Sequence, residues 1–262
     1  MSRLLEVRDL TVKYDGEGNA IENMNMVLEH KEIVGIVGES GSGKTTFVRA
    51  IINLLSPNAK VVSGEIIFNG QDIRKYNQEQ WRNLRGNEIT MIFQNPGAYI
   101  NPIIKIGRQF VESIRSHRNL SKADAAKKAK ETLEKMSLGD IDRIMNAYPF
   151  QLSGGMQQRV AIAMALAMEP KLIVADEPTS ALDVVTQVQI IHELMALRNH
   201  FDTGMILVTH NIGCAAYMAD RIMVMHKGKV VECEDKSKLI RNPQMEYTQK
   251  LLNAIPELKG LR

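Results

Sequence analysis

The segment at residues 38–45, GESGSGKT, leaves this chain few folds to choose from. It fits the pattern G-x-x-x-x-G-K-[ST], in which glycines let the backbone approach phosphate oxygens closely. A short, β-branched apolar run at residues 32–37 precedes it and is typical of a buried strand. Apolar side chains at helical spacing follow it and predict a helix over residues 45–55. A strand, a glycine loop and a helix in this order predict a phosphate site at the start of that helix.

The composition is that of an ordinary globular protein. With 262 residues, 44% hydrophobic and 24% charged, the chain suits one large domain or a domain that carries an inserted lobe. A net charge of +3 is too small for a nucleic-acid footprint, so we expect no nucleic-acid partner. No apolar run approaches the ~20 residues that cross a bilayer, and the N-terminus lacks the apolar core of a secretory signal. We therefore expect a cytoplasmic location, with Cys214 and Cys233 as small buried hydrophobes.

Residues 95–151 differ in character from the chain on either side. Strand patterns disappear there, and helical patterns replace them. The segment 121–124, SKAD, is a capping box that opens a charged helix. The buried face of this helix is expected to carry Ala125, Ala129, Leu133 and Met136. We predict a helical lobe at residues 95–151, inserted into the rest of the fold.

The rest of the chain alternates strand and helix patterns, as parallel sheets require. Beyond those already named, strands are expected at residues 4–13, 61–68, 89–93, 172–175 and 205–208, and helices at residues 184–198 and 212–218. The first two of these strands indicate an antiparallel part, with an Asn69-Gly70 turn. We therefore predict an α/β fold: a P-loop core with a parallel sheet and an N-terminal antiparallel β subdomain, formed by residues 1–94 and 152–262.

Polar residues follow four of the predicted strands directly. They are the loop at residues 38–45, Gln94, the Asp176-Glu177 pair and His210. Ligands of open parallel sheets sit at the carboxyl ends of the strands. If these strands are parallel neighbours, the four polar groups converge on one edge of the sheet.

The residue types at this edge suit phosphate chemistry. Lys44 is expected to reach the β- and γ-phosphates of a nucleotide, and the Thr45 hydroxyl to ligate Mg²⁺. Asp176 ends a very apolar strand, where metal coordination would offset the cost of burying its charge. Glu177 is then the candidate general base for an attacking water, the alternative being a helix-capping acid before Pro178.

Three further side chains have both a functional and a structural interpretation. Gln94 is expected to ligate Mg²⁺ or hold the attacking water, the alternative being a plain loop amide. His210 is expected to contact the γ-phosphate, although a lone histidine is more often structural. Tyr14 is expected to stack on adenine, although an aromatic residue at a strand end often simply packs.

A second anion-binding segment occurs at residues 152–159, LSGGMQQR. Ser153 is a good helix N-cap, and the glycines after it leave the N–H groups at the helix start uncovered. One chain would then carry two surfaces that grip phosphate. A head-to-tail dimer, in which Ser153 of each chain faces Lys44 of the other, would use both. The alternative is an ordinary capped helix.

The whole set resembles the ATP-binding subunit of ABC transporters over nearly the full chain. The matching motifs are Walker A at residues 38–45, Walker B with its catalytic glutamate at 172–177, the signature at 152–157, the Q-loop at Gln94, the D-loop at 180–183, the switch histidine at His210 and the aromatic A-loop at Tyr14. The resemblance implies ATP and Mg²⁺ as cofactors. It implies catalytic roles for Glu177, His210 and Gln94, and Mg²⁺ ligands in Thr45, Gln94 and Asp176. The implied nucleotide-binding residues are Tyr14, Gly38, Ser40, Gly41, Ser42, Gly43, Lys44, Thr45, Thr46, Ser153, Gly154, Gly155, Gln157 and Asp183.

Within that family, the chain is similar to the oligopeptide, dipeptide and nickel importer group. The similar segments are residues 92–96, 101–102, 148–156, 176–185 and 247–256. It departs from the group at Asn211, where an Asp is usual, and at Tyr99-Ile100, where a small residue and Leu are usual. Peptide is the expected cargo, with nickel or another metal chelate next and oligosaccharide third.

The resemblance also implies partners and a location. These are two transmembrane permease subunits, a second ATP-binding subunit (identical or different) and, indirectly, an external solute-binding protein, with the chain peripheral at the cytoplasmic face of the membrane. An exporter subunit is disfavoured by the similarity to importers. A clamp acting on DNA or ribosomes is disfavoured because the inserted lobe is short and the chain carries one cassette.

Overall fold

The computed structural model describes residues 3–16, 18–95, 97, 99–180, 183–200 and 203–254. The chain forms two compact units. The first unit comprises Met1–Gln78 and Asp202–Arg262, and the second comprises Glu79–Phe201. The second unit holds the helices of the predicted lobe together with two strands, and the boundaries of the lobe itself stay a prediction. Pro96, Ala181, Leu182, Ile255 and Pro256, which belong to the similar segments, lie outside the described residues.

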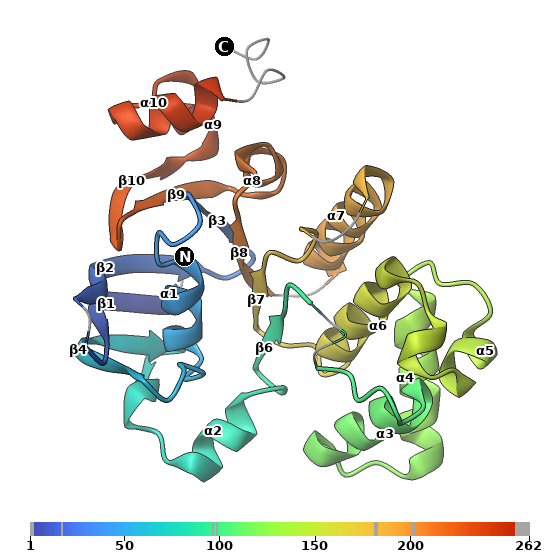
Figure 1. The fold of residues 1–262 in the computed structure, drawn as a ribbon. Coiled ribbons are helices and arrows are strands. Elements are labelled where there is room, and N and C mark those ends of the chain that lie inside the picture. The colour runs from blue at the N-terminus through green and yellow to red at the C-terminus, as the bar shows by residue number, and fades with distance from the viewer. Residues whose placement is uncertain are drawn as a thin grey trace. The chain divides into compact units, whose positions relative to one another are not determined.

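An antiparallel sheet forms one part of the first unit (Figure 1). Its strand order is β2-β1-β4-β5, with β1 at Arg3–Tyr14, β2 at Asn19–Glu29, β4 at Ala59–Phe68 and β5 at Gln71–Asp72. This sheet confirms the predicted antiparallel subdomain. The sequence patterns had not indicated β2, because its apolar positions are interrupted by polar residues and its pairing with β1 shifts register several times.

The phosphate-loop strand β3 lies at the centre of the other sheet of this unit. β3 (Ile33–Val37) pairs in parallel with β8 (Gly204–Thr209) on one side and β9 (Arg221–His226) on the other. β10 (Lys229–Asp235) continues the sheet antiparallel to β9. Every residue of β3 and β8 is buried, as the apolar runs in the sequence predicted.

Short helices complete the first unit. They are α1 (Lys44–Ile51), η1 (Ile73–Lys75), α8 (Ile212–Met218), α9 (Lys236–Arg241) and α10 (Glu246–Asn253). Figure 1 shows α9 and α10 beside the β9–β10 hairpin. The prediction that the first helix reaches residue 55 was wrong. α1 ends at Ile51 because Asn53 adopts a left-handed backbone with φ 52°, which terminates a helix.

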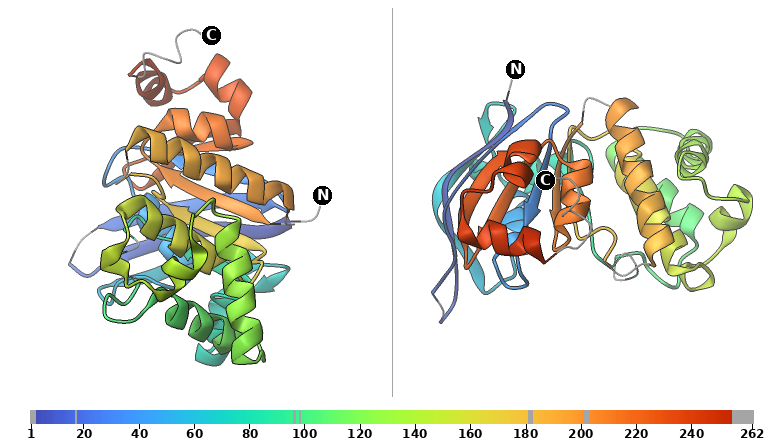
Figure 2. Two further views of the ribbon diagram at one scale, coloured as in Figure 1. Left: turned by 90° about the vertical axis from the view of Figure 1, so that its right-hand side faces the viewer. Right: turned by 90° about the horizontal axis from the view of Figure 1, so that it is seen from above.

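The second unit joins two strands to a set of helices. β6 (Ile89–Ile92) pairs in parallel with β7 (Leu172–Asp176). Its helices are α2 (Gln78–Leu84), α3 (Ile106–His117), α4 (Lys122–Glu134), α5 (Ile141–Asn146), η3 (Pro149–Gln151), α6 (Gly154–Leu166) and α7 (Val184–His200). Both views of Figure 2 show α3 to α6, coloured green to yellow, as one group of helices. The predicted apolar face of α4 is confirmed for Ala125, Ala129 and Leu133, which are 0% exposed. Met136 is also buried, but it lies beyond the end of α4 at Glu134, so its prediction as part of the helix was wrong.

The two cysteines are not fully buried, so that prediction was wrong. Cys214 and Cys233 are both partly exposed free thiols. Burial still raises the pKa of the Cys214 thiol to about 11. The Arg221 guanidinium donates to Cys233 Sγ over 3.6 Å. Over the described ranges, no helix is both long and apolar enough to cross a membrane.

The cap of α4 offers a test of the lobe. Ser121 Oγ accepts the Asp124 N–H over 3.1 Å and donates to the Asp124 carboxylate over 2.6 Å. We expect Ser121→Ala to lower the free energy of unfolding by about 1 kcal/mol, because an N–H at the helix start loses its partner. The control is Ser116→Ala on α3, which removes an exposed hydroxyl that caps no helix. Denaturant unfolding that gave equal losses for both variants would contradict the capping role.

Candidate functional site

The loop at residues 38–45 is organised around a buried ammonium group. Lys44 is 5% exposed, and its Nζ donates to the carbonyl oxygens of Gly38 (2.7 Å) and Glu39 (2.8 Å). Ser42 Oγ lies 3.4 Å from the same nitrogen. The loop therefore wraps its own lysine and holds a positive charge at the start of α1, where helix N–H groups add to the positive potential.

The β9–β10 turn braces this loop from the side. A Cβ on Gly38 would lie 2.2 Å from the Met225 carbonyl oxygen, so only glycine allows this close approach. The Gly228 N–H donates to the Ser42 carbonyl over 3.0 Å. This support was not predicted from the sequence. The Lys227-Gly228 pair, with φ values of 47° and 77°, is a hairpin signal that indicates the turn but not its contact with the loop.

Tyr14 and Thr46, both predicted to bind nucleotide, meet in the first unit. The Tyr14 hydroxyl and Thr46 Oγ1 lie 3.2 Å apart, within hydrogen-bond distance. Tyr14 ends β1, and Thr46 lies in the first turn of α1. This contact places an aromatic ring beside the phosphate loop. Stacking of the ring on adenine stays a prediction.

His210 lies at the end of the strand next to the phosphate-loop strand. Val37, the last residue of β3, pairs with Thr209, the last residue of β8, and the exposed His210 follows. Asn211 then caps α8, because its Oδ1 accepts the N–H groups of Gly213 (2.9 Å) and Cys214 (3.2 Å). The amide oxygen of Asn211 accepts these bonds as the carboxylate of an Asp would. The cap therefore tolerates Asn at position 211, where the similar importers usually have Asp.

In the second unit, the ends of β6 and β7 bring Gln94 to Glu177. Ile92 pairs with Ala175, and the Gln94 amide donates to Glu177 Oε2 over 3.3 Å. Asp176 is 5% exposed. Glu177 has a φ of 49°, a left-handed backbone that is unfavourable for a residue with a Cβ. Glu177 thus combines a left-handed backbone with a carboxylate that lies within hydrogen-bond distance of Gln94.

The signature segment begins α6 with an open helix end. Ser153 Oγ accepts the Met156 N–H over 3.3 Å, and both Ser153 and Gly154 are exposed. The predicted N-cap is therefore confirmed. The Gln157 amide donates to the carbonyl oxygens of Pro149 (3.0 Å) and Leu152 (3.1 Å), so in this chain it also holds the segment that leads into the helix.

Asp183 begins α7. Its carboxylate accepts the Thr186 N–H over 3.0 Å and the Thr186 hydroxyl over 2.7 Å. These hydrogen bonds hold the pKa of the Asp183 carboxyl below its usual range. A Cβ on Gly155 of α6 would lie 2.7 Å from Thr186 Cγ2, so the starts of α6 and α7 lie close together.

The predicted site residues thus fall into two groups, one in each unit. The group of the first unit is Tyr14, Gly38, Ser40, Gly41, Ser42, Gly43, Lys44, Thr45, Thr46 and His210. The group of the second unit is Gln94, Ser153, Gly154, Gly155, Gln157, Asp176, Glu177 and Asp183. That both groups act on nucleotide is a proposal.

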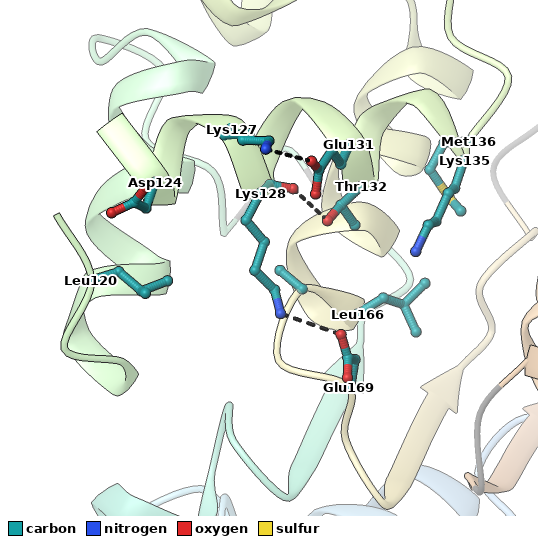
Figure 3. A pocket seen from close by; sticks show the side chains of 11 residues that line it. Leu120, Asp124, Lys127, Lys128, Glu131, Thr132, Lys135, Met136, Leu166 and Glu169 are labelled. Atoms are coloured by element: carbon teal, nitrogen blue, oxygen red, sulfur yellow. Dashed lines mark hydrogen bonds and ion pairs between the residues drawn. The ribbon is translucent and has the colours of Figure 1, made fainter. Parts of the chain in front are cut away.

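A separate hollow of about 310 Å³ lies in the second unit, along α4 and the end of α6 (Figure 3). It contains none of the predicted site residues. Figure 3 shows its ion pairs, Lys127 with Glu131 (4.0 Å) and Lys128 with Glu169 (3.3 Å). With Asp124 and Lys135, the charges that line the hollow cancel. A neutral lining does not suit a triphosphate, so the loop at residues 38–45 is the better phosphate site.

A loop of this kind, at the end of a buried parallel strand, defines the class of P-loop nucleotide hydrolases. Residues 21–180 match the ABC transporter family. The chain therefore belongs to the ABC transporter family, and it is an ATP-binding ATPase of that family.

Similar proteins support this assignment. The chain is 43% identical to the oligopeptide transport ATP-binding protein OppD of Bacillus subtilis, over 99% of this chain and 74% of that protein. It is 40% identical to the dipeptide transport ATP-binding protein DppD of Lactococcus lactis, over 97% of this chain and 74% of that protein. The dimeric post-hydrolysis structure of the ATP-binding cassette MJ0796 with ADP and Pi has a TM-score of 0.78 and 31% identity, covering 88% of this chain and 98% of that chain.

The phosphate-loop assignment predicts the effect of losing Lys44. We expect Lys44→Ala to weaken ATP binding by about 10- to 100-fold, because a charge-assisted contact to phosphate is lost. Lys60→Ala is the control, since Lys60 is an exposed lysine of the same unit that pairs with Asp15. Equilibrium titration with a fluorescent ATP analogue measures both variants. Unchanged affinity in Lys44→Ala would count against the assignment.

Proposed function

We propose that this chain is the ATP-hydrolysing subunit of an ABC importer that takes up peptides. The observation that carries the proposal is its similarity, at 40–43% identity over at least 97% of its length, to ATP-binding proteins of dipeptide and oligopeptide transport. ATP hydrolysis in such a subunit powers transport through membrane partners. The cargo itself contacts those partners and not this chain.

The two groups of site residues are proposed to act on nucleotide together. Lys44 and the N–H groups of its loop hold the phosphates. Glu177 accepts a proton from the attacking water. The Gln94 amide, which donates to Glu177 Oε2 over 3.3 Å, orients the Glu177 carboxylate. His210, exposed at the end of β8, is proposed to contact the γ-phosphate.

The oxygen donors of the site fit Mg²⁺. Thr45 offers an exposed hydroxyl, Asp176 a buried carboxylate, and Gln94 an amide oxygen. Hard oxygen ligands of these types are the ones that Mg²⁺ prefers. These three residues would hold the ion, which would offset the negative charge of the phosphates.

A dimer is proposed to complete each ATP site. Ser153 and Gly154 are exposed at the start of a 13-residue helix, where N–H groups can bind the phosphates of a nucleotide held by a second chain. The MJ0796 cassette, a structural neighbour, is dimeric. ATP that contacts both chains favours the closed dimer. Hydrolysis removes the contact between the γ-phosphate and the second chain, and the dimer then opens. The second chain is identical or a related ATP-binding subunit.

The permease contact is proposed at residues 97–110. Tyr99 and Ile103 are 57% and 79% exposed. The Tyr99 ring stacks on Phe93 with 3.7 Å between ring centroids, and Phe93 directly precedes Gln94. Through this stack, a change at Gln94 on nucleotide binding is proposed to reach the exposed apolar side chains of Tyr99 and Ile103. The partners are two permease subunits and, through them, a solute-binding protein, with this chain peripheral at the cytoplasmic face of the membrane.

Reconstitution tests the cargo. The chain is combined with its permease and binding protein, and ATP hydrolysis is measured with different solutes. Stimulation by peptides supports the proposal. Stimulation only by nickel, another metal chelate or an oligosaccharide would replace peptide as the cargo while leaving the ATPase role in place.

Replacing the proposed base should separate binding from turnover. We expect Glu177→Gln to lower the ATP hydrolysis rate by about 100- to 10,000-fold while ATP binding persists, because the amide cannot accept the proton. Glu169→Gln is a matched control, since Glu169 also has a positive φ (55°) but lies at the neutral hollow. Rapid hydrolysis by Glu177→Gln would refute the role of Glu177 as base.

The composite site predicts complementation between two inactive variants. Ser153→Arg should block closure on the partner's nucleotide and bring ATPase activity close to background. In a mixed dimer of Ser153→Arg with Lys44→Ala, one site combines both defects and the other has neither. We therefore expect the mixture to regain part of the activity. Normal ATPase activity in Ser153→Arg alone, or no recovery in the mixture, would argue against sites shared between chains.

A further inference from the structure

Helix α10 makes direct contact with the phosphate loop. The Tyr247 hydroxyl accepts the backbone N–H of Glu39 over 3.3 Å, across a sequence separation of 208 residues. The Tyr247 ring packs on His226 with 4.1 Å between ring centroids. Both residues belong to the first unit, and His226 ends β9, the strand beside the phosphate-loop strand. The hydroxyl, and not only the ring, is therefore aimed at the loop.

This hydrogen bond acts on the peptide group that also holds Lys44. The N–H of Glu39 and the carbonyl of Gly38 belong to one planar peptide unit. Tyr247 binds the N–H side of that unit, and the Lys44 ammonium donates to its carbonyl side over 2.7 Å. Rotation of this peptide would break both contacts. Tyr247 thus fixes the orientation of a carbonyl that positions the Lys44 ammonium.

The helix that carries Tyr247 is itself anchored to β10. Glu232 is 8% exposed, and its carboxylate accepts the N–H groups of Gln244 (2.8 Å) and Met245 (3.2 Å) just before α10 begins. Thr248 and Leu252 of α10 are at most 1% exposed. The start of the helix is therefore held in place, so Tyr247 reaches the loop from a fixed support.

We propose that Tyr247 is a positioning residue for nucleotide binding, which preorganises the Gly38–Glu39 peptide and the Lys44 ammonium for the phosphates of ATP. This inference rests on the proposed nucleotide site. Ring packing alone would be met equally well by phenylalanine. Burial raises the pKa of the Tyr247 hydroxyl.

The test compares three variants of the full chain by equilibrium titration with a fluorescent ATP analogue. Tyr247→Phe removes only the hydroxyl, and Tyr247→Leu removes hydroxyl and ring. Both should weaken ATP binding by a similar factor, about threefold to tenfold, because both lose the same hydrogen bond. Tyr76→Phe is the matched control: it loses a surface hydroxyl of the same unit that donates to Gln71, and its affinity should not change.

Two further readouts separate positioning from packing. In Tyr247→Phe, KM for ATP should rise while kcat at saturating ATP stays within about twofold of wild type, since the proposed base Glu177 is unchanged. Hydrogen exchange of the Glu39 amide should become faster in Tyr247→Phe and stay unchanged in Tyr76→Phe. Loss of affinity in Tyr247→Leu but not in Tyr247→Phe would overturn the proposal, because the ring and not the hydroxyl would then be responsible.

Lys44→Ala separates this inference from the proposed site. If Lys44→Ala weakens ATP binding and Tyr247→Phe leaves both binding and Glu39 exchange unchanged, the nucleotide site stands and the positioning role fails. If Lys44→Ala itself binds ATP normally, the proposed site fails, and the positioning role fails with it.

Discussion

The hydrogen bonds between the buried Lys44 ammonium and the carbonyl oxygens of its own loop are the contacts on which the first unit depends. A buried cation is costly unless polar groups surround it. Here the chain supplies them at 2.7 and 2.8 Å, from Gly38 and Glu39. Such a loop keeps its shape only with outside support, and the β9–β10 hairpin provides it through Met225 and Gly228. The sheet around β3 therefore does more than cover an apolar strand, because it fixes a charged loop.

The second unit also carries a charged residue type at a buried position, and there strand pairing positions the polar side chains. Asp176 lies at the buried end of β7, and Glu177 leaves that strand through a left-handed backbone. The strain at Glu177 is compatible with folding because the strand before it pairs along its length with β6. The Gln94 amide, two residues after the end of β6, then donates a hydrogen bond to the Glu177 carboxylate. Strand pairing thus determines where both polar side chains lie.

Much of this architecture could be predicted from the sequence, because several elements leave local signals. The run before Gly38, the cap at Ser121 and the apolar face of α4 all follow short-range patterns that the structure confirms. β2 and the end of α1 were not predicted. In β2 the register shifts blur the alternation of side chains. α1 ends at Ile51, two residues before the left-handed Asn53, and no strong sequence pattern marks that position.

In the candidate site too, some residues could be predicted from local sequence patterns and others could not. Motif spacing predicted the residues that end strands, such as Gln94 and Glu177, because parallel pairing aligns strand ends. It gave no indication of Gly228 or Tyr247, whose contacts with the phosphate loop join segments far apart in the chain. Contacts of that kind depend on how the hairpin and α10 pack, and no local pattern in the sequence encodes this packing.

The position of β3 between β8 and β9 has a consequence for how the protein is made. The loop after β3 is synthesised early, yet both neighbouring strands and the hairpin that braces it come from residues 204–235. On the ribosome, β3 therefore stays without its partner strands until residues 204–235 have emerged. A chain that ends before residue 204 would lack both strands that flank β3 and the hairpin that contacts the phosphate loop.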